Sequence, residues 1–292
     1  VCNVFLGRVT GGLAIVTVVV CMFFAAVSGS GPATVAAVGS MVVPTMLEKG
    51  YSKSFTLACV ACAGCIGVII PPSIPMVIYG VSGQQSISKM FMAGIIPGIL
   101  IAVGLSVMHF FLCRNLKTEG LDWSLKTFIH SLRDGFWSIL APVIILGGIY
   151  AGIFTPTEAG GVGVLYCLIV GKFVYKGLKK EHFIPILRET ISGTATVMLI
   201  IVSATVFGYY LNWENIPTML LNAVTSFASN KFLVLLVMNV VLLIVGMFLE
   251  GGAALIILAP LMVPIVKAAG IDLVHFGIVC NVNIMIGGLT PP

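Results

Sequence analysis

The chain has 292 residues, of which 59% are apolar and only 9% are charged, with a formal net charge of +5 and a mean hydropathy of +1.15. A soluble domain needs more charge on its surface, so this composition excludes that class and predicts a chain embedded in a lipid bilayer. Several apolar stretches of about twenty residues predict an all-α polytopic membrane protein. The positive charge is typical of loops on the cytoplasmic side, and we expect no nucleic-acid partner.

The first predicted element is a re-entrant helical hairpin over residues 8–47. An apolar helix at 11–27 ends at a tip of sequence SGSGP at 28–32, and a second short helix follows at 34–47. Pro cannot continue a helix, and the glycines relax the backbone. Irregular backbone at membrane depth is tolerated only where it is buried in protein or lines a cavity. The tip is therefore a candidate binding element.

A broken transmembrane helix is predicted next, over residues 54–80. Its interruption at 67–72 ends in two adjacent prolines, which lack the N–H groups that would pair with carbonyls one turn earlier. A further helix at 91–112 returns across the membrane and completes a first repeat at 1–112.

The middle of the chain, residues 113–230, is predicted to begin with an amphipathic surface helix at about 123–132, on the cytoplasmic side. Crossing helices are then expected at 136–154, 159–175 and 190–211. Glu158 stands beside a Thr-Pro-Thr turn, and we expect it to cap the helix that starts there.

Residues 231–292 are predicted to be a second, truncated repeat. Sliding the chain by a constant 220 residues superimposes Gly31 on Gly251, Gly50 on Gly270, and Gly67 on Gly287. The second copy therefore holds a hairpin at 232–266 and a half-helix at 273–287 before another Pro-Pro break. Two such interrupted segments in an apolar chain indicate a transporter binding site.

The distribution of basic residues predicts that the two repeats are inverted. Counting crossings places twelve of the 15 Lys and Arg residues on the cytoplasmic side, and the opposite orientation reverses the bias. With this orientation the first hairpin opens from the cytoplasm and the second from outside. We also expect the chain to be a fragment, because it begins within an apolar stretch and stops at the second Pro-Pro pair.

Both tips and both breaks are expected to converge near the membrane midplane. Helix C-terminal carbonyls together with hydroxyl groups suit a dehydrated Na⁺. One predicted site uses the side chains of Ser28 and Ser30 with carbonyls around Gly67 and Ile70. The second uses carbonyls around Gly251 and Gly287 with the Thr290 hydroxyl. The alternative for Ser28 and Ser30 is simple helix capping.

The helices that resume after each interruption point their free N–H groups at the same centre, and this suits a carboxylate substrate. The candidate substrate-binding residues are Ser30, Gly31, Pro32, Ser73, Glu250 and Gly252. Glu250 is an acid deep in an apolar stretch, which costs about 2.5–3.5 kcal/mol on insertion scales. It would balance a cation, carry a proton, or accept hydrogen bonds from nearby backbone N–H groups.

Cys59, Cys62 and Cys65 follow one another at helical spacing. The sequence shows no His or acid near them, so we favour small-residue helix packing over a metal site. His109, His130, His182 and His275 are scattered near segment ends and predict no ligand cluster or proton relay.

Four separated motifs together resemble the large membrane subunit of the tripartite ATP-independent periplasmic (TRAP) transporters. They are FFAAVSGS at 23–30, IIPPSIP at 69–75, GGIYAGIFTPTEA at 147–159 and GGLTPP at 287–292. The resemblance covers essentially the whole chain, with the motifs in the family's order. It implies an elevator-type importer of the bacterial inner membrane that is coupled to Na⁺ and has two Na⁺ sites.

The resemblance also assigns parts and partners. It implies that 113–230 contributes scaffold helices, while both repeats belong to a moving transport part. It adds Pro72 and Pro292 to the cation sites. A periplasmic substrate-binding protein would deliver a carboxylated solute, and a small four-helix membrane subunit would enlarge the scaffold. The pair Gly251-Gly252 departs from the family pattern, which leaves the ligands of the second site open.

Two other interpretations stay open. The same elements would suit a stand-alone Na⁺-coupled divalent-anion carrier that needs no binding protein. A channel or a membrane-embedded enzyme would usually show a filter repeat or a catalytic cluster, and neither is evident, so we expect no enzyme activity. The sequence does not choose among C4-dicarboxylates, sialic acid and other sugar or keto acids.

Overall fold

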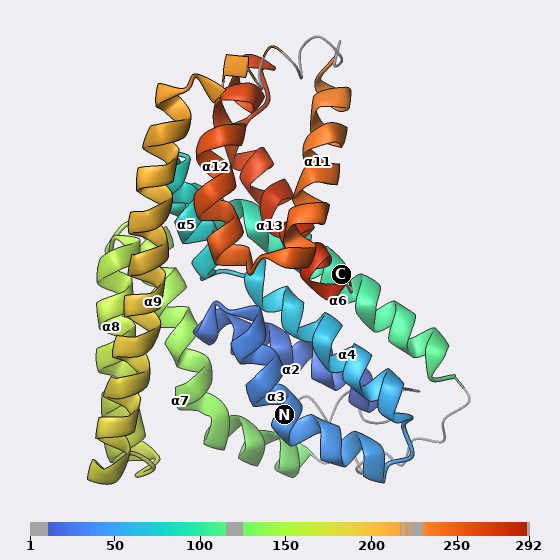
Figure 1. Cartoon of the computed structure of the whole chain (residues 1–292). Coiled ribbons are helices and arrows are strands. Elements are labelled where there is room, and N and C mark those ends of the chain that lie inside the picture. Colours follow the sequence, from blue (N-terminus) through green and yellow to red (C-terminus); the bar gives the residue numbers. More distant parts are fainter. Residues whose placement is uncertain (1–10, 115–124, 217, 220–221, 223–229, 291–292) are drawn as a thin grey trace. The chain divides into compact units, whose positions relative to one another are not determined.

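The computed structural model describes residues 11–114, 125–216, 218–219, 222 and 230–290. Every regular element in these ranges is helical (Figure 1). By length and composition, five of the described helical segments are able to cross a membrane: Ile87–Leu112, Pro156–Val174, Lys180–Leu211, Lys231–Phe248 and Gly251–Ala268. The prediction of an all-α polytopic membrane protein is confirmed.

Internal contacts divide the chain into two units, and each is described by itself. The first comprises Val1–Ile74 and Phe91–Gly163, and the second comprises Pro75–Met90 and Val164–Pro292.

In the first unit, α2 (Gly12–Ser28), α3 (Gly31–Glu48) and α4 (Lys53–Cys65) pack side by side (Figure 1). Gly29 ends α2 with a φ of 62°, a left-handed conformation that suits glycine. α3 begins directly after Ser30 with Pro32 in its first turn, so the tip between the helices is only two residues long.

A short 3₁₀ turn, η1 (Ile66–Val68), follows α4 and leads into the break. Beyond the break come α5 (Ile74–Ser82) and α6 (Ile87–Leu112). α7 (Leu125–Tyr150) and the start of α8 (Pro156–Ile169) complete the first unit.

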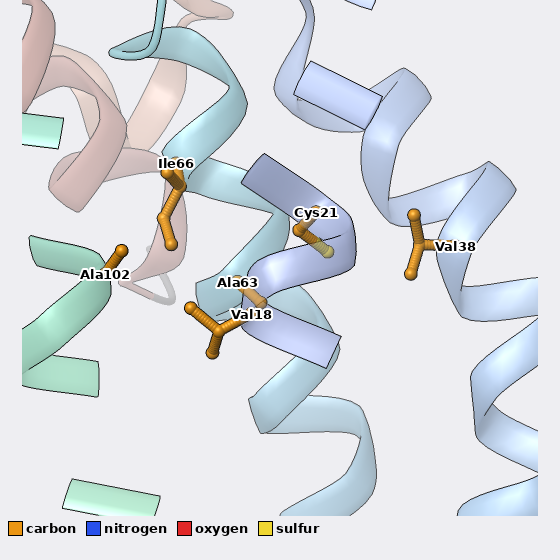
Figure 2. Close-up of a cluster of buried hydrophobic side chains, with 6 residues drawn as sticks. All are labelled: Val18, Cys21, Val38, Ala63, Ile66 and Ala102. Atoms are coloured by element: carbon orange, nitrogen blue, oxygen red, sulfur yellow. The ribbon is translucent and has the colours of Figure 1, made fainter. Parts of the chain in front are cut away.

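The core of the first unit is built from small and branched side chains of α2, α3, α4, η1 and α6 (Figure 2). Its buried members are Val18, Cys21, Val38, Ala63, Ile66 and Ala102. A Cβ placed on Gly64 would lie 2.2 Å from the Val35 side chain, so α3 and α4 approach closely there. Small residues that let helices approach are typical of packing within membranes.

The second unit contains α9 (Lys180–Trp213), α11 (Lys231–Phe248), α12 (Gly251–Ala268) and α13 (Leu273–Leu289), together with α5. α9 packs on α12, and α11 packs along α13 (Figure 1). α5 is held by Tyr79, whose hydroxyl donates to the Leu273 carbonyl at 2.8 Å. The Tyr79 ring also lies edge-on to Phe276, with the ring centroids 6.5 Å apart.

The helix bounds follow the sequence repeat closely. α3 and α12 begin and end at positions that differ by the same 220 residues, as do the capping residues Ser52 and Asp272. Gly50 and Gly270 close the two hairpins with φ angles of 81° and 66°. The two segments therefore share a local architecture, and their opposite orientation in the membrane stays a prediction.

The middle of the chain differs from the prediction in its helix bounds. In place of a surface helix at 123–132 and a separate crossing at 136–154, α7 runs unbroken from Leu125 to Tyr150. The charges before Gly135 do not break a helix, and one interior Gly costs only about 1 kcal/mol. Residues 123–124 lie outside the described residues. α7 stops early because Gly152 takes a φ of 72°.

The next two helices also have unexpected bounds. α9 begins at Lys180, not at 190, and Pro185 lies inside it. The residues around Pro185 are mostly good helix formers despite their charge. α8 is shorter than expected, because a π-helical turn (Val170–Val174) takes over after Ile169.

The contact between α11 and α13 leads to a stability prediction. A Cβ on Gly287 would lie 2.8 Å from the Cα of Gly246, whereas one on Gly288 would meet its nearest neighbour at 3.8 Å. Gly287→Ala should therefore force the helices apart and cost about 1–3 kcal/mol. Gly288→Ala should be neutral or slightly stabilising, because Ala favours a helix. Thermal unfolding of the purified variants measures both, and equal midpoints would contradict the close contact.

Candidate functional site

Three oxygen atoms meet at the tip of the first hairpin. The Thr34 hydroxyl donates to the Ser30 carbonyl at 2.8 Å, and its Oγ1 lies 2.9 Å from the Ser28 Oγ. Thr34 is fully buried, and Ser28 is partly buried. A buried group of hydroxyl and carbonyl oxygens without a carboxylate suits a weakly bound monovalent cation.

The helix break lies directly against this oxygen cluster. A Cβ on Gly67 would stand 2.9 Å from the Thr34 Oγ1 and 3.5 Å from the Ser30 carbonyl oxygen. A Cβ on Gly29 would stand 2.9 Å from the Pro72 carbonyl oxygen. The structure therefore brings together four predicted cation-site residues of the first repeat: Ser28, Ser30, Gly67 and Pro72.

Hydrogen bonds hold the two ends of the break. The Ile70 N–H donates to the Ile66 carbonyl at 3.0 Å, which keeps Ile70 on the last turn before the prolines. The Ser73 hydroxyl donates back to the Val68 carbonyl at 2.5 Å. The Ile74 N–H donates to the Gly29 carbonyl at 3.1 Å, so the resumed helix is tied to the hairpin tip.

The remaining candidates of the first tip occupy the start of α3. Ser30 is the N-cap, and its Oγ accepts from the Ala33 N–H at 3.5 Å. Gly31 is buried against Val68, while Pro32 is exposed. The capping interpretation of Ser30 is confirmed, and its role as a ligand stays a prediction.

Sequence reasoning did not select Thr34 as a ligand. Its hydroxyl reaches the carbonyl four residues back, a bond that Thr commonly makes inside helices. The available signal was its spacing of four from Ser30 directly after a tip already under suspicion.

In the second repeat Glu250 occupies the position that Ser30 has in the first. It is the N-cap of α12, and its Oε2 accepts from the N–H groups of Gly252 at 3.1 Å and Ala253 at 3.3 Å. Its side chain is exposed. This is the third of the roles considered for Glu250, hydrogen bonding to nearby backbone, and the cation and proton roles stay predictions.

The other residues of the second tip pack tightly. A Cβ on Gly252 would lie 3.2 Å from the Ile78 side chain, and one on Gly251 would lie 3.4 Å from Ile284. The Thr290 hydroxyl donates to the carbonyls of Ile286 at 3.0 Å and Gly287 at 2.8 Å.

Thr290 thus binds the carbonyls that end α13. Pro292 lies outside the described residues. The predicted meeting of the two tips joins residues of different units and stays a prediction.

The expectation that no histidine lies near the cysteines is wrong for one pair. Cys59 Sγ lies 4.0 Å from His109 Nδ1 and 3.9 Å from the Ala14 carbonyl oxygen. The spacing in sequence hid this contact, because α6 brings His109 back to α4 from 50 residues away. Among the described residues, no three His, Cys, Asp or Glu side chains are placed to hold a metal.

The predicted cap at Glu158 is confirmed. Its Oε2 accepts from the Thr155 N–H and hydroxyl, both at 2.8 Å, and its own N–H donates to the Thr155 Oγ1 at 3.3 Å. This reciprocal pair is a capping box at the start of α8.

The chain matches the family described as "Tripartite ATP-independent periplasmic transporter, DctM component" over residues 1–292. It is 48% identical over 289 residues to an isethionate TRAP transporter permease protein, DctMQ, of Oleidesulfovibrio alaskensis, covering 98% of this chain and 46% of that relative. It is 43% identical over 291 residues to the C4-dicarboxylate TRAP transporter large permease protein DctM of Pseudomonas aeruginosa, covering 99% and 68%.

A third relative is the sialic acid TRAP transporter large permease protein SiaM of Vibrio cholerae. It is 41% identical over 287 residues, covering 98% of this chain and 67% of the relative. The chain thus spans about half the length of the first relative and about two thirds of the other two.

Two substitutions separate the roles considered for Glu250. Glu250→Ala removes the cap of α12 and should cost about 0.5–2 kcal/mol of stability. Glu250→Gln keeps an oxygen that accepts from the same N–H groups, so a capping role predicts nearly normal stability and Na⁺ response. Thermal unfolding with and without Na⁺ measures both. A Gln variant that loses its Na⁺ response as fully as the Ala variant would instead assign the charge a role.

Proposed function

The chain belongs to the DctM component family of the tripartite ATP-independent periplasmic transporters, and from this we infer that it acts in the secondary import of an organic acid. It is a multi-pass membrane protein. Its relatives are transporter permeases, not enzymes.

The solute that we propose carries a carboxylate or another acidic group. The relatives are named for isethionate, C4-dicarboxylates and sialic acid, which are all organic acids. In this chain, α3 and α12 each begin at a hairpin tip, where first-turn N–H groups are available to an anion. The proposed contacts are with Ser30, Gly31, Pro32 and Ser73 in the first unit and with Glu250 and Gly252 in the second.

Coupling to Na⁺ is the second part of the proposal, and the buried oxygen cluster at the first tip is the observation that carries it. The hydroxyls of Ser28 and Thr34 and the carbonyl of Ser30 lie within hydrogen-bond distance of one another. Oxygen atoms are the ligands that hard cations prefer. Na⁺ would replace the hydroxyl-to-hydroxyl contact with a shared cation.

The mechanism that we propose is an elevator motion in the bacterial inner membrane. The two interrupted repeats would move as the transport part, while helices between 113 and 230 belong to the scaffold. A small four-helix membrane subunit and a periplasmic substrate-binding protein would complete the transporter. The alternative, a stand-alone Na⁺-coupled divalent-anion carrier, differs in needing no binding protein.

Uptake into liposomes tests the proposal. The full-length transporter is reconstituted with its small subunit, and labelled organic acid is added with or without the binding protein. We expect uptake only when an inward Na⁺ gradient and the binding protein are both present. Uptake of free substrate without the binding protein would favour the alternative carrier, and uptake that ignores Na⁺ would refute the coupling.

The first cation site is tested by removing its hydroxyls one at a time. Ser28→Ala, Ser30→Ala and Thr34→Val should each raise the Na⁺ concentration for half-maximal uptake. A contact between a polar group and a charge is worth about 1.5–3 kcal/mol, which corresponds to about tenfold or more.

Thr45→Val is the matched control, because Thr45 lies on the same helix and bonds the Met41 carbonyl at 3.2 Å on an exposed face. An unchanged Na⁺ dependence in all three tip variants would remove them as ligands.

A further inference from the structure

Two asparagines link α11 to α13 within the apolar part of the second unit. The Asn283 carboxamide donates to the Asn239 Oδ1 and to the Val279 carbonyl, the latter at 2.8 Å. Asn239 in turn donates to the Leu235 carbonyl at 2.6 Å. Asn283 is buried, with 8% of its surface exposed, and Asn239 is half-buried. Each carboxamide is thus anchored on its own helix and joined to the other.

Such a pair has a larger effect on geometry than on total stability. Hydrogen bonds between helices in a bilayer are worth about 0.6 kcal/mol on average, and up to about 2 kcal/mol. The rest of the α11–α13 contact is backbone against backbone at Gly246 and Gly287, with no side chain to define a register. A directional bond between Asn239 and Asn283 supplies that register.

The pair lies one helical turn before the residues proposed for the second cation site. Ile284, next to Asn283, contacts the tip at Gly251. Gly287 follows one turn later, and its carbonyl accepts from both the N–H and the hydroxyl of Thr290. A rotation or slide of α13 on α11 would therefore displace these groups together.

The first repeat has no such pair. The positions 220 residues earlier are Val19 and Ala63, and Ala63 lies in the apolar cluster of Figure 2. There the break is tied instead to the tip through the Ile74 N–H and the Gly29 carbonyl. The two repeats thus share helix bounds but hold their breaks in place by different bonds.

We propose that Asn239 and Asn283 are positioning residues for the second cation site: their hydrogen bond sets the register of α13 on α11 and so places Gly287 and Thr290 for Na⁺. The inference rests on the proposed Na⁺ coupling and deepens it. Neither carboxamide touches the ion, and both act through the end of α13.

The test measures the Na⁺ concentration for half-maximal thermal stabilisation of the purified protein, with K⁺ replacing Na⁺ at constant ionic strength. Asn239→Ala and Asn283→Ala should each raise it by about threefold to tenfold, the equivalent of one bilayer hydrogen bond. The double variant should shift no further than either single variant, because both remove the same bond. Asn239→Asp keeps an acceptor for Asn283 and should recover most of the response.

Asn281→Ala is the matched control. Asn281 lies on the same helix two residues earlier, and its carboxamide donates only to its own helix, at the Gly277 carbonyl 2.7 Å away. It should leave the Na⁺ response unchanged. If Asn239→Ala and Asn283→Ala lower the unfolding midpoint but leave the Na⁺ concentration unaltered, the pair is structural and the inference fails. A wild-type protein that does not distinguish Na⁺ from K⁺ would instead refute the coupling itself.

Discussion

Inside a bilayer, every backbone N–H and C=O that leaves a helix must find a partner within the protein. This chain leaves its helices at membrane depth, and the described structure shows how the exposed groups are satisfied. Gly29 donates its N–H to the Ala25 carbonyl as α2 ends, and its own carbonyl accepts from Ile74 across the break. Ser73 and Thr290 turn their hydroxyls back onto carbonyls of the preceding turn. The polar residues at the interruptions are there first to make irregular backbone tolerable.

The same requirement explains why candidate ligands and helix caps coincide. Ser30 and Glu250 hold equivalent positions, and each accepts from N–H groups of the helix it begins. A side chain that already offers oxygen to a helix end needs little rearrangement to share it with a cation. Capping and ion binding are therefore compatible roles of one residue. The two tips differ in charge, however, because a hydroxyl stands at one and a carboxylate at the other.

Local signals in the sequence predicted the parts of the fold that depend on backbone chemistry. Gly and Pro placed both tips and the first break, and the 220-residue offset anticipated the equal bounds of α3 and α12. The sequence misled where charge was taken as a sign of loop, since α7 and α9 continue through charged residues. It was silent on contacts between distant segments. Neither the approach of His109 to Cys59 nor the bond between Asn239 and Asn283 has a local signature.

Gly67 and Gly287 show where two related halves of a chain are free to diverge. Around each, neighbouring atoms come within 3 Å of where a side chain would begin, Thr34 in one half and the backbone of Gly246 in the other. Residues that face lipid drift under a loose requirement to remain apolar, whereas these two positions have no room for even a methyl group. Mutational drift should therefore erase most of the likeness between the halves and spare it at such points of contact. An old duplication would then be recognised by its glycines long after its side chains had ceased to match.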